Sequence, residues 1–121
     1  MIRSGHTFTV YFDGVSDITA TDTNFNAIDY AGSLYFGDRG DNARNMNGSL
    51  AEVAKWDRAL SADEIKALSK GYSPRCFLNG LKWYMPMIRD FNEIKTGIAV
   101  TNNGGSTAAD HPRIIYCGQG V

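Results

Sequence analysis

The pattern of apolar and polar residues near the start of the chain predicts a β-hairpin. Residues 6–12, HTFTVYF, alternate large apolar side chains with threonine and tyrosine, which is typical of a half-buried strand. The dipeptide Asp13-Gly14 follows directly, and it favours the type I′ turn of a two-residue hairpin. We therefore expect residues 15–21 to form the returning strand.

A second pattern, with helical spacing, predicts one short helix near residues 62–70. Ser61 has the side chain of an N-cap, and Glu64 can complete a capping box with it. Gly71 supplies the left-handed residue that commonly ends a helix. The apolar positions form a narrow stripe, so this helix is expected to pack on a sheet. We expect four side chains to hold it there: Trp56, Leu60, Ile65 and Leu68.

More strands are expected at residues 32–37, 48–57, 97–101 and 113–117, and within the apolar stretch 77–90. Residues 48–57 place apolar side chains at both odd and even positions, which indicates a bulge or burial on both faces of the strand. A proline in the apolar stretch restricts it to an edge or a bulge. Four side chains of that stretch share one face: Leu81, Trp83, Met85 and Met87.

Residues 48–68, GSLAEVAKWDRALSADEIKAL, resemble the closing motif of laminin-G-like, concanavalin A-type jelly-roll domains. In that family a G-x-I-D-E-V strand is followed by an aromatic residue, R-A-L-S and a short helix with an acidic cap. Residues 9–15, TVYFDGV, are similar to the family's mid-domain Y-V-D-G hairpin. The resemblance implies a mainly β fold, an antiparallel β-sandwich of the jelly-roll type, with one short helix near residues 62–70.

The sandwich is expected to be incomplete, because the family's N-terminal strands should precede the hairpin and there is little chain before it. We expect residues 1–75 to form a partial laminin-G-like sandwich with the capped helix. Residues 76–121 are expected to supply a return strand and an extended tail that packs on the same sandwich or on a partner. Missing strands leave sheet edges open, so we expect an oligomer or a protein docked on a larger assembly, with the apolar stretch 77–90 as the interface.

Composition and charge restrict the partners. The 121 residues carry a formal net charge of −1, with Lys and Arg scattered along the chain, so nothing favours nucleic acid. No apolar run approaches the ~18 residues of a membrane span, and residues 1–10 lack the apolar core of a signal peptide. We expect no membrane partner, and synthesis in the cytoplasm. In that reducing compartment Cys76 and Cys117 are expected as two free thiols, with a disulfide between them as the alternative.

Motifs of catalysis are absent from the sequence. Glycosidases of this broad fold class carry paired carboxylates on one strand, but Glu52 has no acidic residue two or four positions away. No G-x-S-x-G nucleophile motif and no glycine-rich phosphate loop occur. His111-Pro112 is interpreted as a turn. We therefore expect no enzymatic activity, and a degenerate glycosidase is the catalytic alternative.

The loop of residues 38–42, DRGDN, offers the best calcium candidates. Asp38, Asp41 and Asn42 carry the oxygen ligands that calcium prefers, and the resemblance implies calcium at the loop rim of some family members. The D-x-D-x-D-G spacing is absent, and Ala51 replaces an Asp that is frequent in the family. A solvated loop and no cofactor form the favoured interpretation, with calcium as the alternative.

Carbohydrate binding requires exposed aromatic rings beside amide and carboxylate groups. The aromatic candidates are Tyr30, Tyr35, Tyr72, Trp56 and Trp83. In a chain of this size, packing in the core is the favoured interpretation for each of them.

The strings GLKWYMPMIRD, GIAVT and DHPRI resemble the C-terminus of laminin-G-like structural proteins encoded by bacteriophages. This resemblance implies a non-catalytic virion protein, in the capsid decoration or the tail, which docks on other copies of itself and on other virion proteins. The alternative is a carbohydrate-binding or adhesion module, calcium-assisted or not, whose partner is a surface glycan. The packing and interface residues expected on the first interpretation are Trp56, Leu60, Ile65, Leu68, Trp83, Met85 and Met87.

Overall fold

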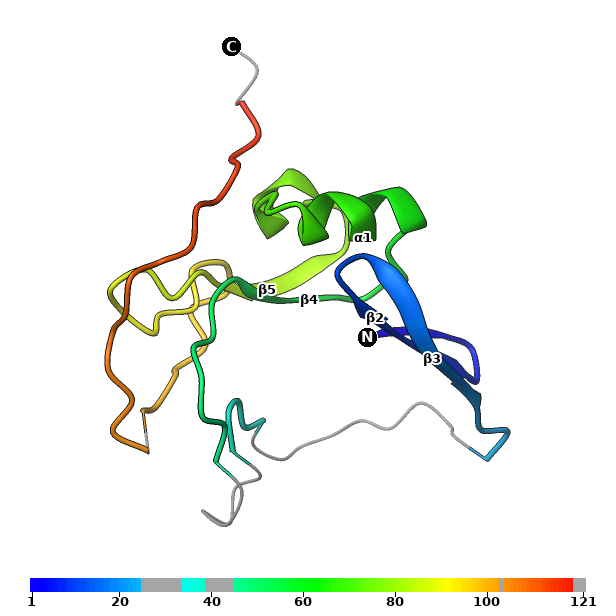
Figure 1. The fold of residues 1–121 in the computed structure, drawn as a ribbon, viewed down its shortest axis with the longest axis horizontal. Coiled ribbons are helices and arrows are strands. Elements are labelled where there is room, and N and C mark those ends of the chain that lie inside the picture. Colours follow the sequence, from blue (N-terminus) through cyan, green and yellow to red (C-terminus); the bar gives the residue numbers. More distant parts are fainter. Residues whose placement is uncertain (25–33, 39–44, 103, 119–121) are drawn as a thin grey trace.

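The computed structural model describes residues 1–24, 34–38, 45–102 and 104–118. They form two antiparallel sheets and one short helix (Figure 1). The elements follow the chain in the order β1 (Ile2–Ser4), β2 (Thr7–Phe12), β3 (Val15–Thr21), β4 (Val53–Trp56), α1 (Ala62–Ser69), the 3-10 turn η1 (Pro74–Cys76) and β5 (Leu81–Met85). The first sheet has the strand order β1-β2-β3, and the second sheet pairs β4 with β5. The prediction of a mainly β, antiparallel sandwich with one short helix is confirmed.

The β2–β3 hairpin forms as the sequence predicts. Asp13 and Gly14 occupy its turn with φ of 50° and 81°, the left-handed values that a type I′ turn requires. Phe12 pairs with Val15 across the turn, and the ladder contains one bulge further along. Strand β1 was not predicted, because its three residues are too few to show a period; Gly5, with φ of 58°, turns the chain from β1 into β2.

The strands of the second sheet are shorter than predicted. Residues 48–57 contribute only β4, because Glu52 has a left-handed φ of 56° that interrupts the extended chain. Residues 77–90 contribute only β5, which begins after the turn at Gly80 and ends before the buried Pro86. A left-handed residue and a proline therefore set the length of this sheet.

The other predicted strands are wrong where the structure describes them. Of residues 32–37, the first two lie outside the described residues and the rest are not in a strand. Residues 97–101 form no strand, and residues 113–117 are reduced to one parallel bridge between Tyr72 and Ile115. A strand needs a neighbour to pair with, and the alternation of these segments does not supply one.

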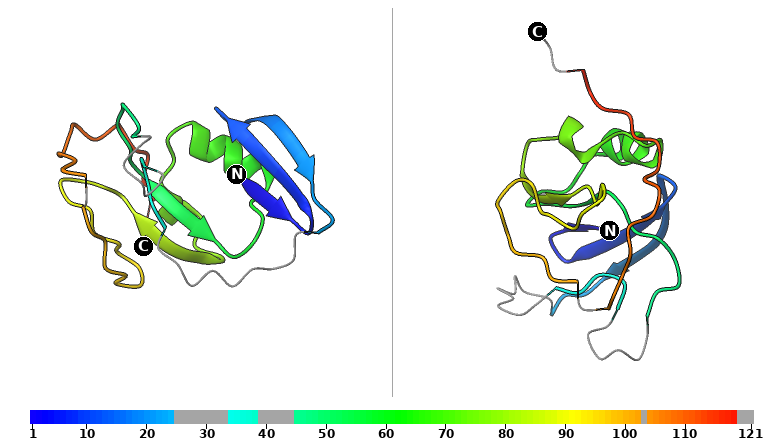
Figure 2. Two further views of the ribbon diagram at one scale, coloured as in Figure 1. Left: turned by 90° about the horizontal axis from the view of Figure 1, so that it is seen from below. Right: turned by 90° about the vertical axis from the view of Figure 1, so that its left-hand side faces the viewer.

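Helix α1 begins and ends close to its predicted bounds and lies beside both sheets (Figures 1 and 2). The capping box is present: Glu64 N donates to Ser61 Oγ at 3.2 Å, and Ser61 N donates to the Glu64 carboxylate at 2.8 Å. A Cβ placed on Gly14 would lie 3.3 Å from the Cα of Lys66. The turn of the β2–β3 hairpin therefore abuts the helix.

The fully buried apolar residues of the described chain, prolines apart, all lie on β5. They are Leu81, Tyr84 and Met85. Tyr84 has the opposite parity to the other two, so β5 is covered on both faces rather than on the single face predicted. Trp83 is half-buried and packs edge-to-face on Phe36, with the ring centroids 5.7 Å apart.

The side chains predicted to hold the helix are less buried than those of β5. Trp56, Leu60, Ile65 and Leu68 are all half-buried, as is Met87. No residue of α1 is fully buried. The indole Nε1 of Trp56 donates to the carbonyl of Phe77 at 2.7 Å, which fixes the ring beside the chain that leads to β5.

The expectation of two free thiols is wrong, because Cys76 and Cys117 form a disulfide. They are 41 positions apart in the sequence. The parallel bridge between Tyr72 and Ile115 brings their segments together, a placement that the cellular compartment argument could not anticipate.

Candidate functional site

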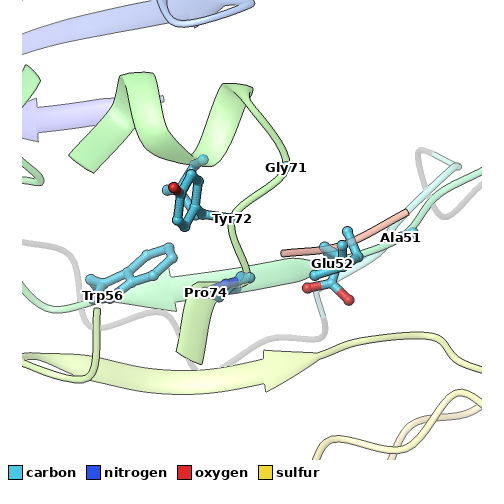
Figure 3. Close-up of a pocket in the computed structure, with 9 residues that line it drawn as sticks. Ala51, Glu52, Trp56, Gly71, Tyr72 and Pro74 are labelled. Atoms are coloured by element: carbon cyan, nitrogen blue, oxygen red, sulfur yellow. The ribbon is translucent and has the colours of Figure 1, made fainter. Parts of the chain in front are cut away.

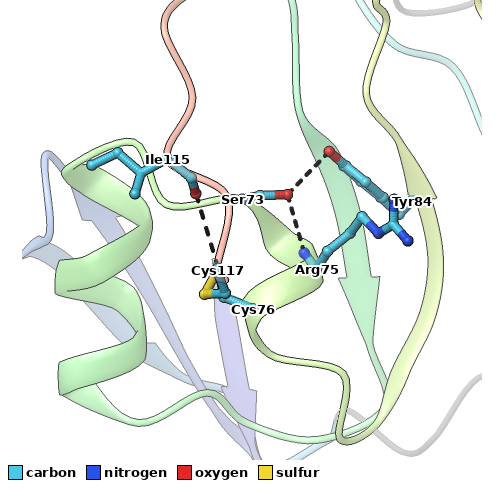
Figure 4. Close-up of a disulfide and its surroundings, with 6 residues drawn as sticks. All are labelled: Ser73, Arg75, Cys76, Tyr84, Ile115 and Cys117. Carbon is cyan, nitrogen blue, oxygen red and sulfur yellow. Dashed lines mark hydrogen bonds between the residues drawn. A yellow bond between two sulfur atoms is a disulfide. The ribbon is translucent and has the colours of Figure 1, made fainter. Parts of the chain in front are cut away.

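Residues 111–117, which we call the strap, run beside the chain segment that leaves helix α1. Ile115 N donates to Gly71 O at 2.8 Å, and Ser73 N donates to Ile115 O at 2.9 Å. Figure 4 shows the disulfide between Cys76 and Cys117 next to these contacts. A pair of backbone hydrogen bonds and one covalent bond thus fix the strap to residues 71–76.

A polar cluster lies where the strap meets the rest of the chain; it consists of Glu52, Ser73 and Tyr84, together with His111 from the strap itself. The Tyr84 hydroxyl donates to Glu52 Oε2 at 2.6 Å. The Ser73 and Tyr84 hydroxyl oxygens are 3.3 Å apart, and Arg75 N donates to Ser73 Oγ at 3.3 Å (Figure 4). Ser73 and Tyr84 are fully buried, so a buried hydroxyl chain links η1, β5 and the residue before β4.

Tyr84 is held as a hydrogen-bond donor. Burial, reinforced by the hydrogen bond to Glu52, raises the pKa of the Tyr84 phenol. The phenol therefore keeps its proton and donates a hydrogen bond to Glu52 Oε2, which leaves its oxygen to accept from the Ser73 hydroxyl. This arrangement satisfies polar groups that would otherwise be costly to bury.

His111 connects the strap to this cluster. Its Nε2 lies 2.9 Å from Pro86 O and 3.1 Å from Glu52 Oε1, and its Nδ1 lies 2.9 Å from Pro112 O. Both ring nitrogens therefore face a backbone carbonyl, and Nε2 also faces the Glu52 carboxylate. Glu52 Oε1 is buried without a hydrogen bond.

A hollow of about 310 Å³ lies between β4, the end of α1 and the strap. Figure 3 shows the rings of Trp56 and Tyr72 near each other, with the Glu52 carboxylate directed away from both rings. The residues that line it are Ala51, Glu52, Ala54, Trp56, Leu68, Gly71, Tyr72, Pro74 and Ile114. Its volume is at the lower end for a ligand site, and its walls are largely apolar and aromatic as such sites require.

A second carboxylate, Glu93, organises the loop that follows β5. It accepts hydrogen bonds from Tyr84 N at 2.9 Å, from Thr96 N at 2.7 Å and from Gly97 N at 2.8 Å. Lys95 N and the Thr96 hydroxyl also donate, at 2.8 and 2.7 Å. Burial raises the pKa of Glu93, but these hydrogen bonds outweigh it and lower the pKa to about 2. An ionised Glu93 therefore fastens residues 93–97 to β5.

The contacts of these acidic groups hold segments of the chain together. Glu52 is occupied by Tyr84 and His111, and Glu93 is surrounded by amide donors. The described contacts of the Ser73 hydroxyl are to Tyr84 and Arg75 N, not to His111. The groups are thus arranged to bind segments of the chain to one another.

The calcium candidates from the sequence are only partly placed. Asp38 is half-buried, and Asp41 and Asn42 lie outside the described residues. Within the described part of the chain, no group of three or more His, Cys, Asp or Glu side chains is placed to hold a metal ion. No helix among those residues is long and apolar enough to cross a membrane.

The aromatic candidates separate into two places. Trp56 and Tyr72 meet at the hollow, whereas Trp83 packs on Phe36. Tyr35 is 50% exposed and does not line the hollow; Tyr30 lies outside the described residues. The interpretation of these rings as core residues is therefore wrong for Tyr35 and for Tyr72, which is 37% exposed.

Sequence reasoning missed Tyr84, Glu93 and the structural role of His111. Glu93 had a local signal, because Thr96 and Gly97 follow at the distance at which a side-chain oxygen can accept from their amides. Tyr84 and His111 had no local signal in the sequence, because their partner Glu52 is 32 residues from Tyr84 and still further from His111.

Two antiparallel sheets and a capped helix define a protein of the β-sandwich class. A family model described as the concanavalin A-like lectin/glucanases superfamily matches residues 1–66. This is more than half of the 121-residue chain, and the protein belongs to that superfamily. No curated protein and no solved structure shows a significant match. The match includes the whole first sheet, strand β4 and the start of α1, whereas residues 67–121, with β5 and the strap, lie outside it.

Proposed function

We propose that the protein is a non-catalytic docking domain, which acts as a structural component of a bacteriophage virion by binding copies of itself and other virion proteins. The exposed first sheet carries this proposal. Every residue of β3 is exposed, and Val15 and Ile18 on it are 68% and 57% exposed. An edge strand with exposed apolar side chains favours pairing with another chain.

The rest of the molecule supports the same conclusion. The fully buried apolar residues of the described chain, prolines apart, are confined to β5, so the first sheet has little core of its own. A three-stranded sheet gains independent stability by packing a face on another layer. The virion assignment rests on the resemblance of the strings in residues 80–114 to phage structural proteins. That resemblance concerns a part of the chain beyond the family match.

Self-association tests the docking proposal. Sedimentation velocity across the micromolar range, in reductant so that no disulfide links copies, should show concentration-dependent oligomers of the wild-type chain. Ile18→Lys should weaken this association at least tenfold, because it places a charge on the docking face, whereas Thr19→Lys, on the opposite face of the same exposed strand, should change it less. A well-folded monomer at all concentrations contradicts docking between copies. Mass spectrometry of gradient-purified particles tests the virion assignment.

A second candidate function is carbohydrate binding at the hollow. Two observations favour it: the family description includes lectins, and Trp56 and Tyr72 present rings at one concave place. The apolar face of a sugar ring can stack on such side chains. A glycan array with and without calcium should show specific retention that Tyr72→Ala removes and Tyr35→Ala leaves intact. Retention that is the same for both variants contradicts a site at the hollow.

A further inference from the structure

We propose that the strap is exchanged between two copies of the chain, so that the strap of each copy occupies the groove beside residues 71–76 of the other. The inference rests on the proposed docking function and names its partner as a second copy. It identifies a defined contact surface, with the strap as the occupant.

The structure shows what fits the groove, because the chain's own strap is seated there. Its contacts are few: the two backbone hydrogen bonds of Ile115, the contacts of His111 with Glu52 and with Pro86 O, and the disulfide. Ile114 adds an apolar wall to the hollow. Each of these contacts can form with the same geometry when the strap comes from another copy, which is the basis of exchange between identical chains.

The chain that leads to the strap allows the exchange. Beyond the loop held by Glu93, every described residue of 98–110 is exposed. Apart from a contact of Ile98 N with Glu93, the hydrogen bonds found in the described part of this segment are local, between Asn102 and Ser106. Figures 1 and 2 show this orange segment running along the outside of the molecule. Because it is exposed, such a connection loses few packing contacts when it changes direction.

The length of the connection is sufficient. Residues 98–110, fully extended, can span about 40 Å, at about 3.3 Å per residue. This span exceeds the width of one copy set by its radius of gyration of about 14 Å. The strap can therefore reach either groove, and dimer formation raises the local concentration of the second one.

The chains that the disulfide links show which groove the strap occupied when the bond formed. In the exchanged dimer, Cys117 Sγ of one copy bonds to Cys76 Sγ of the other, and the reciprocal pair forms likewise. Each bond forms when two thiols lose two electrons and two protons to a disulfide oxidant such as oxidised glutathione, which is reduced to two thiols. Oxidation thereby converts the strap contact into a covalent link between copies.

An isotope-mixing experiment tests the exchange. Equal amounts of unlabelled and heavy-nitrogen-labelled wild-type chain are mixed in reductant, reoxidised with glutathione, quenched by acid and alkylation, and digested with trypsin. Cleavage after Arg75, Lys82 and Arg113 releases Cys76 in residues 76–82 and Cys117 in residues 114–121. Exchange predicts that about half of the disulfide-linked peptide pairs carry one label of each kind. Pairs of a single label only overturn the proposal.

A second measurement separates failure of the exchange from failure of docking. On a non-reducing gel the protein as purified should migrate as a dimer that reductant converts to a monomer. Co-expressed Cys76→Ser and Cys117→Ser chains should form a linked pair, since each retains the cysteine that the other lacks. Oligomers in sedimentation together with single-label peptides mean that docking holds and exchange is wrong. A monomer with single-label peptides means that both are wrong.

Discussion

Arg58 and Glu64 form a two-point ion pair at the start of helix α1. Arg58 Nη1 donates to Glu64 Oε2 at 2.8 Å, and Nη2 donates to Oε1 at 2.6 Å. The same carboxylate accepts from Ser61 N in the capping box, and Arg58 Nε donates to Asn79 O at 2.8 Å. Arg58 thus joins the first turn of α1 to the turn before β5, which gives a physical reason for an arginine before the A-L-S sequence.

Replacing Arg58 separates the contribution of geometry from that of charge. Arg58→Ala should lower the urea midpoint of unfolding, because it removes the ion pair and the link to Asn79 together. Arg58→Lys should recover only a small part of the lost midpoint, since an ammonium group cannot donate to both carboxylate oxygens with the paired geometry of a guanidinium. Equal midpoints for Arg58→Lys and the wild type would show that charge alone is sufficient.

The acid stability of the protein depends on two carboxylates with lowered pKa values. The hydrogen bond from Arg58, followed by that from the Ser61 backbone, lowers the pKa of Glu64 from 4.5 to about 2; Glu93 is lowered to the same value by its amide and hydroxyl donors. A folded-state pKa below the unfolded one contributes stability that is complete above the unfolded value and is lost as the pH falls through the folded value. Stability should therefore decrease between pH 4.5 and about 2.

Urea unfolding at a series of pH values measures this loss. At 1.36 kcal/mol per pKa unit, Glu93 contributes about 3 kcal/mol at most. Glu93→Gln should be less stable at neutral pH and should show a shallower decline in acid, because its side chain no longer titrates. Asp17→Asn, a change on the exposed strand β3, should retain the wild-type slope. A wild-type slope for Glu93→Gln would contradict the assignment.

Local signals in the sequence were sufficient for the parts of the fold that short-range chemistry decides. Asp13-Gly14 specifies its turn through backbone preference, and Ser61 with Glu64 specifies the start of α1 through two hydrogen bonds within four residues. The length of β4 could not be predicted, because the left-handed conformation of Glu52 is maintained by distant partners. One of them, Tyr84, comes from β5.

The candidate site was harder to predict from the sequence than the fold. Its strap reaches the groove by contacts between residues about forty positions apart, as the Cys76–Cys117 separation of 41 shows. Hydrophobic periodicity carries no information on such pairs, because the strap is not a strand of a sheet. Trp56 and Tyr72 were recognised as aromatic candidates, but their meeting at one hollow depends on where α1 ends.

The contact between the hairpin turn and helix α1 is tested by two glycines that share a left-handed backbone. Gly14 has φ of 81°, and its added Cβ would lie 2.5 Å from Ser69 Oγ and 3.3 Å from Lys66 Cα; Gly5 has φ of 58° with nothing within 4 Å. Gly5→Ala should lose about 1 kcal/mol from backbone strain alone. Gly14→Ala should lose about 1 kcal/mol more, through displacement of the helix. Equal losses in urea unfolding would contradict a close contact between hairpin and helix.

The buried hydroxyl chain predicts a specific response to removal of one oxygen atom. Tyr84→Phe keeps the ring in the core but leaves Glu52 Oε2 and the Ser73 hydroxyl without their partner. Because both groups are then buried with an unmade hydrogen bond, the free energy of unfolding should fall by about 1 to 3 kcal/mol. Tyr35→Phe, an exposed control, should change it little. The double variant Tyr84→Phe with Glu52→Gln should lose less than the sum of the single losses, since the two residues share one interaction. Strictly additive losses would show that the Tyr84–Glu52 hydrogen bond does not stabilise the fold.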